Sequence, residues 1–353
     1  MSFLSEIFST QHHLLGVDIG RSAVKIVQLK PHRGGLRLVR AVLRECPRSS
    51  DDGGMGDLGR ASELFSDGFR NLRAAMNFLG KSPIIRYMTL PKMPREEIRE
   101  AIKWEARKVI PVPIEDLVLD YLVVGEMDDK DGKKLELIVV GAERSAVWSQ
   151  VKEAKKAGIR VEAMDVNPLS LMNTVRLNYK KQMDENLVFV DVGDSKTDVN
   201  IAKTGILRFT RTVQVGGSDI SRAITDELHV PIEEAERMKR EEGMGGVKDG
   251  EGESPLAKTV KVEVDRIIVE VQRSIDYYRA QFREGSIRRI ILMGGTPLMP
   301  GFTEYFASYF DAQTELDDPF AEIHCEDVAS PEIRMMAPRY ATAVGLALRE
   351  VGT

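Results

Sequence analysis

The chain has 353 residues, a mass of 39.5 kDa and a formal net charge of −5, from 50 basic and 55 acidic residues. At ~150 residues per domain, this length predicts about two domains. A hydrophobic content of 42% with 30% charged residues is typical of a folded globular chain and excludes disorder over most of the length. The slight acidic excess argues against nucleic acid or an anionic membrane surface as the ligand.

Residue types that serve redox chemistry or metal binding are sparse. The two cysteines, Cys46 and Cys325, form no C-x-x-C pair, which indicates a reducing compartment such as the cytoplasm. The histidines are scattered outside any H-E-x-x-H pattern, which argues against a protein-ligated zinc. No apolar run approaches the ~20 residues of a membrane helix, and the first residues lack the features of a secretory signal.

The chain opens with apolar and alternating segments separated by a tight turn, the pattern of a β-meander. Its strands are expected at 14–20, 23–29 and 36–46. Residues 47–60 are rich in Gly, Asp and Ser and predict a loop. Residues 62–79 predict a helix.

Residues 83–162 are punctuated by prolines and predict a separate compact unit. Helices are expected at 95–110 and 144–156, with strands at 84–90, 117–124, 135–140 and 159–166. In the first helix Ile98, Ile102 and Val109 share one side and are expected to face inward. Gly158 suits the position just past the end of the second helix.

The opening pattern then recurs. Residues 187–193 form an apolar strand that ends in Asp-x-Gly at Asp191, as the first strand does at Asp18. Each feeds a tight turn and two further strands, here 197–202 and 206–215. The recurrence predicts two similarly folded lobes.

The rest of the chain predicts mostly helices. They are expected at 218–229, 231–242 and 259–283, from about 301, and at 339–351. A buried strand is expected at 287–293, and residues 243–257 are Gly- and acid-rich and predict a loop. The long helix is expected to turn one apolar face inward, made of Val260, Val264, Ile267, Val271, Ile275, Tyr278 and Phe282. Strands alternating with helices define an α/β protein.

The two Asp-x-Gly turns are the first candidates for chemistry. A glycine at a tight turn lets backbone N–H groups approach an anion, and an Asp at a strand end can hold magnesium through water. Two facing turns of this kind could clamp a polyphosphate and its magnesium from both sides, although each could equally be a plain hairpin turn. The candidate metal residues are Asp18 and Asp191. The candidate phosphate-binding residues are Asp18, Gly20, Arg21, Ser22 and Lys25 in the first turn and Asp191, Gly193, Asp194, Ser195 and Thr197 in the second.

A third candidate is the segment Gly216, Gly217 and Ser218. Ser218 is expected to cap a helix, whose unpaired N–H groups and positive dipole end would favour a phosphate. The alternative is a tight connection without a ligand.

Two further features could contact a nucleoside. Gly294, Gly295 and Thr296 follow a strand, and the glycines would let a flat base or sugar lie against the backbone. Glu236 and Lys239 lie three residues apart on one helical face and could bracket a ribose or base. The alternatives are an ordinary loop and a surface ion pair.

The sequence has no P-loop, no G-x-S-x-G elbow and no G-x-G-x-x-G after its first strand, which disfavours a Rossmann fold. The order and spacing of its turns instead resemble the actin-like ATPase superfamily over nearly the whole chain. The resemblance implies an α/β fold of two actin-like lobes, each ribonuclease H-like, with an FtsA-like inserted small subdomain.

Within that superfamily, residues 14–29 and 96–120 are most similar to the PilM family of type IV pilus assembly proteins. The short length and the absence of an amphipathic tail argue against FtsA itself. The implied subdomains are 1–82 with 163–186 and 331–353 (1A), 83–162 (1C), 187–228 with 286–330 (2A) and 229–285 (2B).

The resemblance also implies ligands and partners. ATP and Mg2+ are expected between the two lobes, and the cytoplasmic N-terminal segment of the membrane protein PilN is expected to dock near the inserted subdomain. Through PilN the chain would join PilO and PilP, and pilus assembly ATPases, at the inner face of the bacterial inner membrane. It would touch the membrane only through these partners.

Hydrolysis of ATP is expected to be slow or absent. Many relatives carry Gly-Gly where this chain has Asp194 and Ser195, and the linking helix offers only Asn173 and Asn178 as side-chain amides, with no carboxylate to orient water. Two alternatives remain open at this point. One is a sugar-type kinase with Asp194 as general base, and the other is a filament-forming FtsA-like protein.

Overall fold

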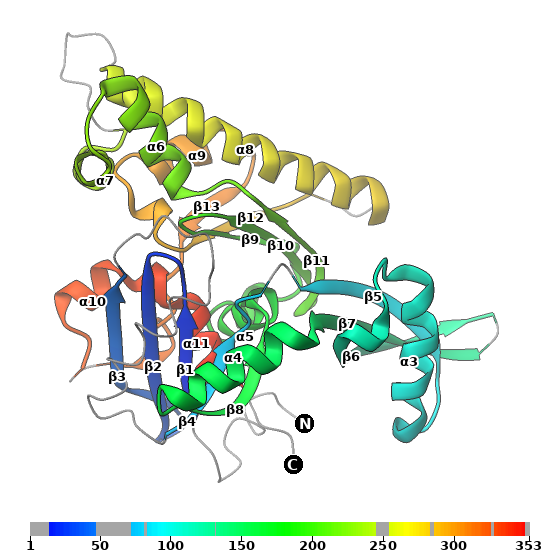
Figure 1. The fold of residues 1–353 in the computed structure, drawn as a ribbon. Coiled ribbons are helices and arrows are strands. Elements are labelled where there is room, and N and C mark those ends of the chain that lie inside the picture. Colours follow the sequence, from blue (N-terminus) through cyan, green and yellow to red (C-terminus); the bar gives the residue numbers. More distant parts are fainter. Residues whose placement is uncertain are drawn as a thin grey trace. The chain divides into compact units, whose positions relative to one another are not determined.

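A computed structural model describes residues 14–46, 72–80, 83–130, 132–244, 254–282, 286–325 and 328–349 (Figure 1). The chain divides into two compact units. Unit 1 comprises Met1–Asp51, Leu72–Asn77 and Glu162–Thr353, and unit 2 comprises Asp52–Asn71 and Phe78–Val161. The four-part subdivision expected from the sequence stays a prediction.

The first sheet of unit 1 has the strand order β14-β3-β2-β1-β4-β8. Its strands are β1 (Leu15–Ile19), β2 (Ala23–His32), β3 (Gly35–Glu45), β4 (Arg73–Asn77), β8 (Arg160–Asp165) and β14 (Ile323–His324). The strands β1, β2 and β3 form an antiparallel meander, as predicted, and β4 lies parallel to β1. We call this sheet with its helices the first lobe.

The second sheet has the order β11-β10-β9-β12-β13. Its strands are β9 (Leu187–Val192), β10 (Thr197–Lys203), β11 (Ile206–Val213), β12 (Arg289–Met293) and β13 (Gln313–Leu316). Here too the first strand pairs antiparallel with the second and parallel with the fourth. The prediction of two similarly folded lobes is therefore confirmed, and we call this sheet with its helices the second lobe.

Helices cover both sheets (Figure 1). The first lobe carries α5 (Asn167–Asn178), α10 (Pro331–Met335) and α11 (Ala341–Ala347), and the second carries α6 (Gly217–Leu228), α7 (Ile232–Glu241), α8 (Pro255–Phe282) and α9 (Phe302–Ala307). The apolar face of α8 joins the second-lobe core, as predicted, except that Phe282 at its end is exposed. Among the described helices, none is long and apolar enough to cross a membrane.

Three predicted helices differ from the structure. Of the helix predicted at 62–79, residues 73–77 form β4, whose Ala74 and Met76 are fully buried in the sheet, and residues 62–71 lie outside the described part. Burial beside β1 overrides the helical preference of alanine. The helix α8 begins four residues before the predicted position, at Pro255. At the end of the chain, a 3-10 turn, η4 (Ala337–Tyr340), precedes the shorter α11.

Unit 2 contains a three-stranded antiparallel sheet of order β5-β7-β6. Its elements are β5 (Ile84–Pro91), α3 (Arg95–Val109), η1 (Ile114–Asp116), β6 (Leu117–Asp129), β7 (Gly132–Glu143) and α4 (Arg144–Lys156). Ile98 and Ile102 pack on the sheet as predicted, whereas Val109 is exposed because Ala106 continues the buried stripe at four-residue spacing. Gly158 ends α4 with a φ of +81°, as expected.

Candidate functional site

The first Asp-x-Gly turn surrounds a buried carboxylate. Asp18, near the end of β1, accepts from Lys25 Nζ at 2.7 Å and from Asn77 Nδ2 at 2.9 Å, one bond on each oxygen. The turn is closed by the Gly20 N–H, which donates to the Ala23 carbonyl at 2.9 Å. Asp18 is therefore held rigidly, with its charge paired to a lysine.

The second turn repeats this backbone geometry with different charges. The Gly193 N–H donates to the Lys196 carbonyl at 2.9 Å. Across the strands Asp191 faces Asp198, in the register in which Asp18 faces Lys25. A carboxylate thus occupies the position that a lysine has in the first lobe.

This pairing changes the titration of Asp191. Burial, followed by the nearby carboxylates of Asp198 and Asp18, raises the pKa of Asp191 to about 7, while Lys25 and Lys196 act in the opposite direction. Asp198 itself is buried, accepts from Thr212 Oγ1 at 2.5 Å and lies 3.5 Å from Lys196 Nζ. The second turn therefore carries more negative charge than its own lysines neutralise.

The two turns meet. Arg21 Nε of the first turn lies 3.7 Å from Asp194 Oδ2 of the second. Ser22 and Ser195 occupy the bends of the same two turns. Thr197, by contrast, is buried and donates its hydroxyl to the Val215 carbonyl at 2.8 Å, which is a structural bond.

The start of α6 differs from the prediction. Gly216 is the cap residue, and its N–H donates to Asp219 Oδ2 at 2.8 Å, while Ser218 is already the second helical residue. The Gly217 and Ser218 N–H groups donate to the carbonyls of Gly193 and Asp194 at 2.9 and 2.7 Å. The expected unpaired N–H groups are therefore taken by the second turn. The buried Ser218 Oγ has no hydrogen-bond partner within the described ranges.

Lys239 is neither a surface residue nor half of a simple ion pair. Its Nζ donates to the Gly217 carbonyl at 2.9 Å, to Ser221 Oγ at 2.8 Å and to Glu236 Oε1 at 2.8 Å, and the residue is only 7% exposed. The lysine connects α7 to the beginning of α6, so it positions the Gly216–Gly217 turn.

The turn after β12 requires its first glycine. Gly294 has a φ of +90°, and a Cβ added there would lie 2.5 Å from Asp191 Oδ1. Its N–H donates to the Pro338 carbonyl at 3.0 Å, and Thr296 Oγ1 donates to the Gly193 carbonyl at 2.9 Å. This turn therefore adjoins the second Asp-x-Gly turn.

The structure thus gathers most of the predicted site residues around two adjoining turns. Sequence reasoning missed Asn77, which it placed in a helix, and Asp198. Asp198 follows Asp191 by seven residues, as Lys25 follows Asp18, so an alignment of the two lobes would have shown it. It also missed three charged residues described below, Glu45, Arg240 and Arg339, which meet only in three dimensions.

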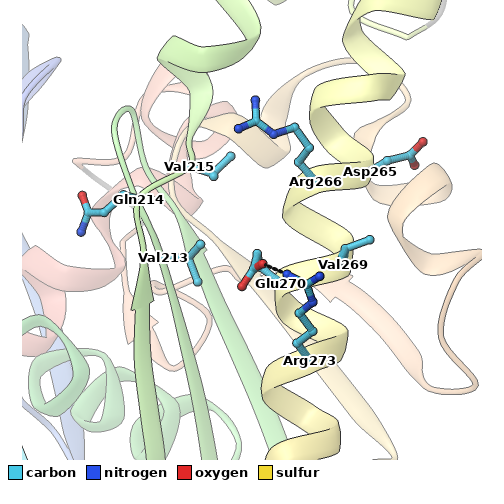
Figure 2. Close-up of a pocket in the computed structure, with 8 residues that line it drawn as sticks. All are labelled: Val213, Gln214, Val215, Asp265, Arg266, Val269, Glu270 and Arg273. Carbon is cyan, nitrogen blue, oxygen red and sulfur yellow. Dashed lines mark hydrogen bonds and ion pairs between the residues drawn. The ribbon is translucent and has the colours of Figure 1, made fainter.

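A groove of about 570 Å³ lies elsewhere, between the end of β11 and α8 (Figure 2). It is lined by Val213, Gln214, Val215, Asp265, Arg266, Val269, Glu270 and Arg273. Glu270 pairs there with Arg273 at 2.5 Å and with Arg211 at 2.8 Å. The groove contains none of the residues predicted to bind a ligand.

Magnesium fits the two turns by charge. In the described part of the chain no three His, Cys, Asp or Glu side chains are grouped to hold a metal by themselves. Mg2+ typically uses one or two carboxylates and completes its shell with water and phosphate oxygens. Asp18 and Asp191 meet that requirement, because the excess negative charge around Asp191 would be offset by a cation.

The two sheets of identical strand order, with paired Asp-x-Gly turns between them, define a two-lobed actin-like ATPase fold. A family model described as "Type IV pilus assembly protein PilM" matches residues 16–351, and the chain belongs to that family.

Two solved structures share the fold. The chain is similar to a structure titled "PilM-PilN type IV pilus biogenesis complex", with a TM-score of 0.81, 23% identity and coverage of 97% of this chain and 99% of that one. It is also similar to the ethanolamine utilization protein EutJ of Carboxydothermus hydrogenoformans, with a TM-score of 0.56, 15% identity and coverage of 97% and 90%.

Curated relatives are more distant. The cell division protein FtsA of Neisseria meningitidis is 24% identical over 68% of this chain and 61% of its own length. The FtsA of Bacillus subtilis is 25% identical over 71% of this chain and 60% of its own length. The chain thus spans about three fifths of the length of these relatives.

Proposed function

We propose that the chain is a nucleotide-binding scaffold of type IV pilus assembly that holds ATP and Mg2+ between its two lobes. The observation that carries this proposal is the meeting of two equivalent Asp-x-Gly turns, joined by Arg21 and Asp194, around an aspartate with uncompensated charge. A polyphosphate with its cation would complete the charge balance there. A protein with the same fold has a structure titled as a nucleotide free form, that of a diol dehydratase-reactivating factor.

Each part of the site has a proposed role. The backbone at Gly20 and Gly193 approaches the phosphates, Lys25 supplies a positive charge, and Asp18 and Asp191 hold the magnesium through water. The Gly294–Gly295 turn supports the nucleoside. When bound, the metal would offset phosphate charge and draw the two turns together.

Slow hydrolysis is part of the proposal. The two amides of α5 are engaged with backbone far along the chain. Asn173 Nδ2 donates to the Gly345 carbonyl at 3.1 Å, and Asn178 Nδ2 donates to the Asp318 carbonyl at 2.9 Å. Neither amide is placed to orient an attacking water. Asp194, the general base of the sugar-kinase alternative, is ion-paired with Arg21.

The proposed partner is the cytoplasmic N-terminal segment of PilN, as in the complex whose fold the chain shares. Through PilN the chain would be peripheral on the inner face of the inner membrane, in contact with PilO and PilP and with assembly ATPases, and would serve twitching motility. Unit 2 offers apolar surface for such a segment. Its exposed large apolar side chains are Tyr87, Trp104, Val109, Val112, Leu122, Val123, Met127 and Trp148.

Calorimetric titration with ATP and Mg2+ tests the nucleotide site. We expect Asp191→Asn to weaken binding at least about tenfold, because a carboxylate ligand of the metal is lost. Asp276→Asn on the exposed side of α8 removes the same charge and serves as the matched control. Unchanged affinity in Asp191→Asn, or turnover at the rate of ordinary kinases, would contradict the proposal.

Tryptophan emission tests the partner. Both tryptophans of the chain, Trp104 and Trp148, lie in unit 2 and are 67% and 62% exposed. A synthetic peptide from the N-terminus of PilN should shift their emission in a saturable way, and a scrambled peptide should not. No shift together with no calorimetric heat would reject PilN as the partner while leaving the nucleotide site untouched.

A further inference from the structure

Three charged side chains from both lobes converge near the Gly294–Gly295 turn. Glu45 ends β3 and Arg339 lies in η4, both in the first lobe, whereas Arg240 lies on α7 in the second. Glu45 Oε1 accepts from Arg339 Nη1 at 2.9 Å, and Glu45 Oε2 accepts from Arg240 Nη2 at 2.9 Å. Each carboxylate oxygen therefore serves one arginine, and the second bond crosses between the lobes.

The pairing is electrostatically favourable. Burial acts to raise the pKa of Glu45, but the hydrogen bonds and charges of Arg240 and Arg339 outweigh it, so the pKa lies below its usual value. Glu45 and Arg240 are each about half exposed, at 45% and 53%, so water and salt can reach the bond between them. Such a bond stabilises closure and can still be broken reversibly.

The bridge adjoins the residues proposed to hold the nucleoside. A Cβ on Gly295 would lie 3.5 Å from Arg339 Nε, so this arginine covers the turn. Arg240 Nε lies 3.7 Å from Glu236 Oε2, and Glu236 in turn binds Lys239. At the phosphate end, Arg21 and Asp194 form a second ion pair between the lobes.

We propose that Glu45 acts as a latch between the lobes, and that breaking its bond to Arg240 limits how fast nucleotide leaves the cleft. This inference rests on the proposed nucleotide site. A ligand enclosed between two lobes leaves when they separate, and separation must break every bond that crosses between them. Removing one such bond lowers the barrier to opening and affects binding of the open form less.

Release of a fluorescent ATP analogue, chased with excess ATP in the presence of Mg2+, tests the latch. We expect Glu45→Gln and Arg240→Gln each to speed release about three- to tenfold, as loss of a half-exposed charged hydrogen bond predicts. The double variant should release no faster than either single one, because both remove the same bond. High salt should speed release from the unsubstituted protein more than from Glu45→Gln.

A control with matched chemistry is Glu234→Gln. Glu234 also pairs with an arginine of α7, Arg237, at 2.6 Å, but within that helix. Its release rate should equal that of the unsubstituted protein. Equal rates in all of these proteins would overturn the latch while leaving the nucleotide site established.

A second measurement needs no nucleotide. The Gly294 N–H donates to the Pro338 carbonyl between the lobes, so its hydrogen exchange reports opening directly. Arg240→Gln should speed exchange at Gly294 and Glu234→Gln should not. Faster exchange without any nucleotide binding would keep the latch as a closure device and reject the proposed nucleotide site. Unchanged exchange together with unchanged release would reject the latch itself.

Discussion

One residue pair distinguishes the two otherwise equivalent turns. In the first lobe the aspartate of the turn faces Lys25 across the strands, and in the second it faces Asp198. Asp18 therefore has a paired charge, whereas Asp191 ionises against burial and against two neighbouring carboxylates. A charge that a bound cation would stabilise is a cost to the protein without that cation.

This cost predicts the effect of Asp191→Asn on stability. The pKa of Asp191 is about 7 in the folded protein and about 3.9 in an unfolded chain. Between these values the folded state binds more protons, so the free energy of unfolding falls as the pH rises from about 4 to about 7. The asparagine removes this penalty. We expect the nucleotide-free variant to gain stability relative to the unsubstituted protein between pH 5 and pH 8, by on the order of 1–3 kcal/mol.

Urea unfolding at pH 5, 6, 7 and 8 without nucleotide measures this difference. Asp276→Asn, an exposed residue of α8, should show a difference that does not change with pH. A gap between Asp191→Asn and the unsubstituted protein that narrows toward pH 8 would refute the assigned charge imbalance.

The residues of the site were predictable only where a local pattern carries them. The two Asp-x-Gly turns and the glycines near 216 and 294 stand out because a tight turn restricts the residue type. Asn77 and Glu45 belong to ordinary strand ends, and only the assembled sheet brings them to the turns. The expectation of unpaired N–H groups at Ser218 was wrong because the second turn supplies carbonyls to them.

At the scale of elements, one buried lysine connects two helices. Lys239 on α7 binds the Gly217 carbonyl at the start of α6 together with Ser221 and Glu236. Lys239→Met should destabilise the protein by about 2–4 kcal/mol, because it leaves the Glu236 carboxylate partly buried without this partner. Thermal unfolding measures the loss.

The matched control is Lys258→Met at the exposed start of α8, which should change the stability by less than about 0.5 kcal/mol. Adding Glu236→Gln to Lys239→Met should recover part of the loss, because the uncompensated charge is then removed. A Lys239→Met protein as stable as the Lys258→Met protein would mean that the connection contributes little.

A second element contact depends on glycine. A Cβ on Gly345 in α11 would lie 1.8 Å from the Ser170 carbonyl of α5, and one on Gly16 in β1 would lie 1.9 Å from the Ala343 carbonyl. We expect Gly345→Ala to cost about 3 kcal/mol, because backbone must move to admit the methyl group. Gly35→Ala, where a Cβ would meet nothing within 4 Å, should be neutral. Equal stability of these two variants, measured by urea unfolding, would disprove the close packing.

Elements were predictable where their period or their capping residue is strong. The helix α4 and the strands of the opening meander follow their patterns closely. The strand β4 was predicted as a helix because it is short, contains two alanines and gains its stability from the neighbouring strands rather than from its own sequence. The strands β13 and β14, with four and two residues, are too short to show a period.

For the molecule as a whole, duplication is the feature that the sequence showed most clearly. The match of strand, turn, strand and strand around Asp18 and Asp191 predicted two equivalent lobes, and the two sheets share their strand order. The bonds between the lobes were not predictable. Glu45 lies 195 residues from Arg240 and 294 residues from Arg339, and no local pattern records such a distance.

The chain passes between the two sheets twice, at 179–186 and at 317–322, and these two connections are bonded to each other. Asn178 Nδ2 donates to the Asp318 carbonyl at 2.9 Å, and the Tyr179 hydroxyl donates to Asp317 Oδ1 at 3.3 Å. Asp317 is buried, with 2% exposure. Any change in the angle between the lobes must therefore act on this carboxyl group.

Asp317 makes the stability of these connections depend on pH. Burial and the charges of Asp318 and Glu315 raise the pKa of Asp317 to about 7, although hydrogen bonds from Tyr179 and Asn178 lower it. The folded state therefore binds the extra proton, and the stability contributed by Asp317 is present at low pH and is lost as the pH rises toward 7.

Asp317→Asn keeps the shape and an acceptor for Tyr179 without the charge. Relative to the unsubstituted protein, we expect it to gain on the order of 1–3 kcal/mol between pH 5 and pH 8 in urea unfolding. Asp318→Asn, next in the chain, is the control and should show a smaller change, because its backbone carbonyl rather than its carboxylate accepts from Asn178. A gain that is equal at both positions would assign the effect to net charge, and a loss at pH 8 in Asp317→Asn would mean that the ionised carboxylate stabilises the connection between the lobes.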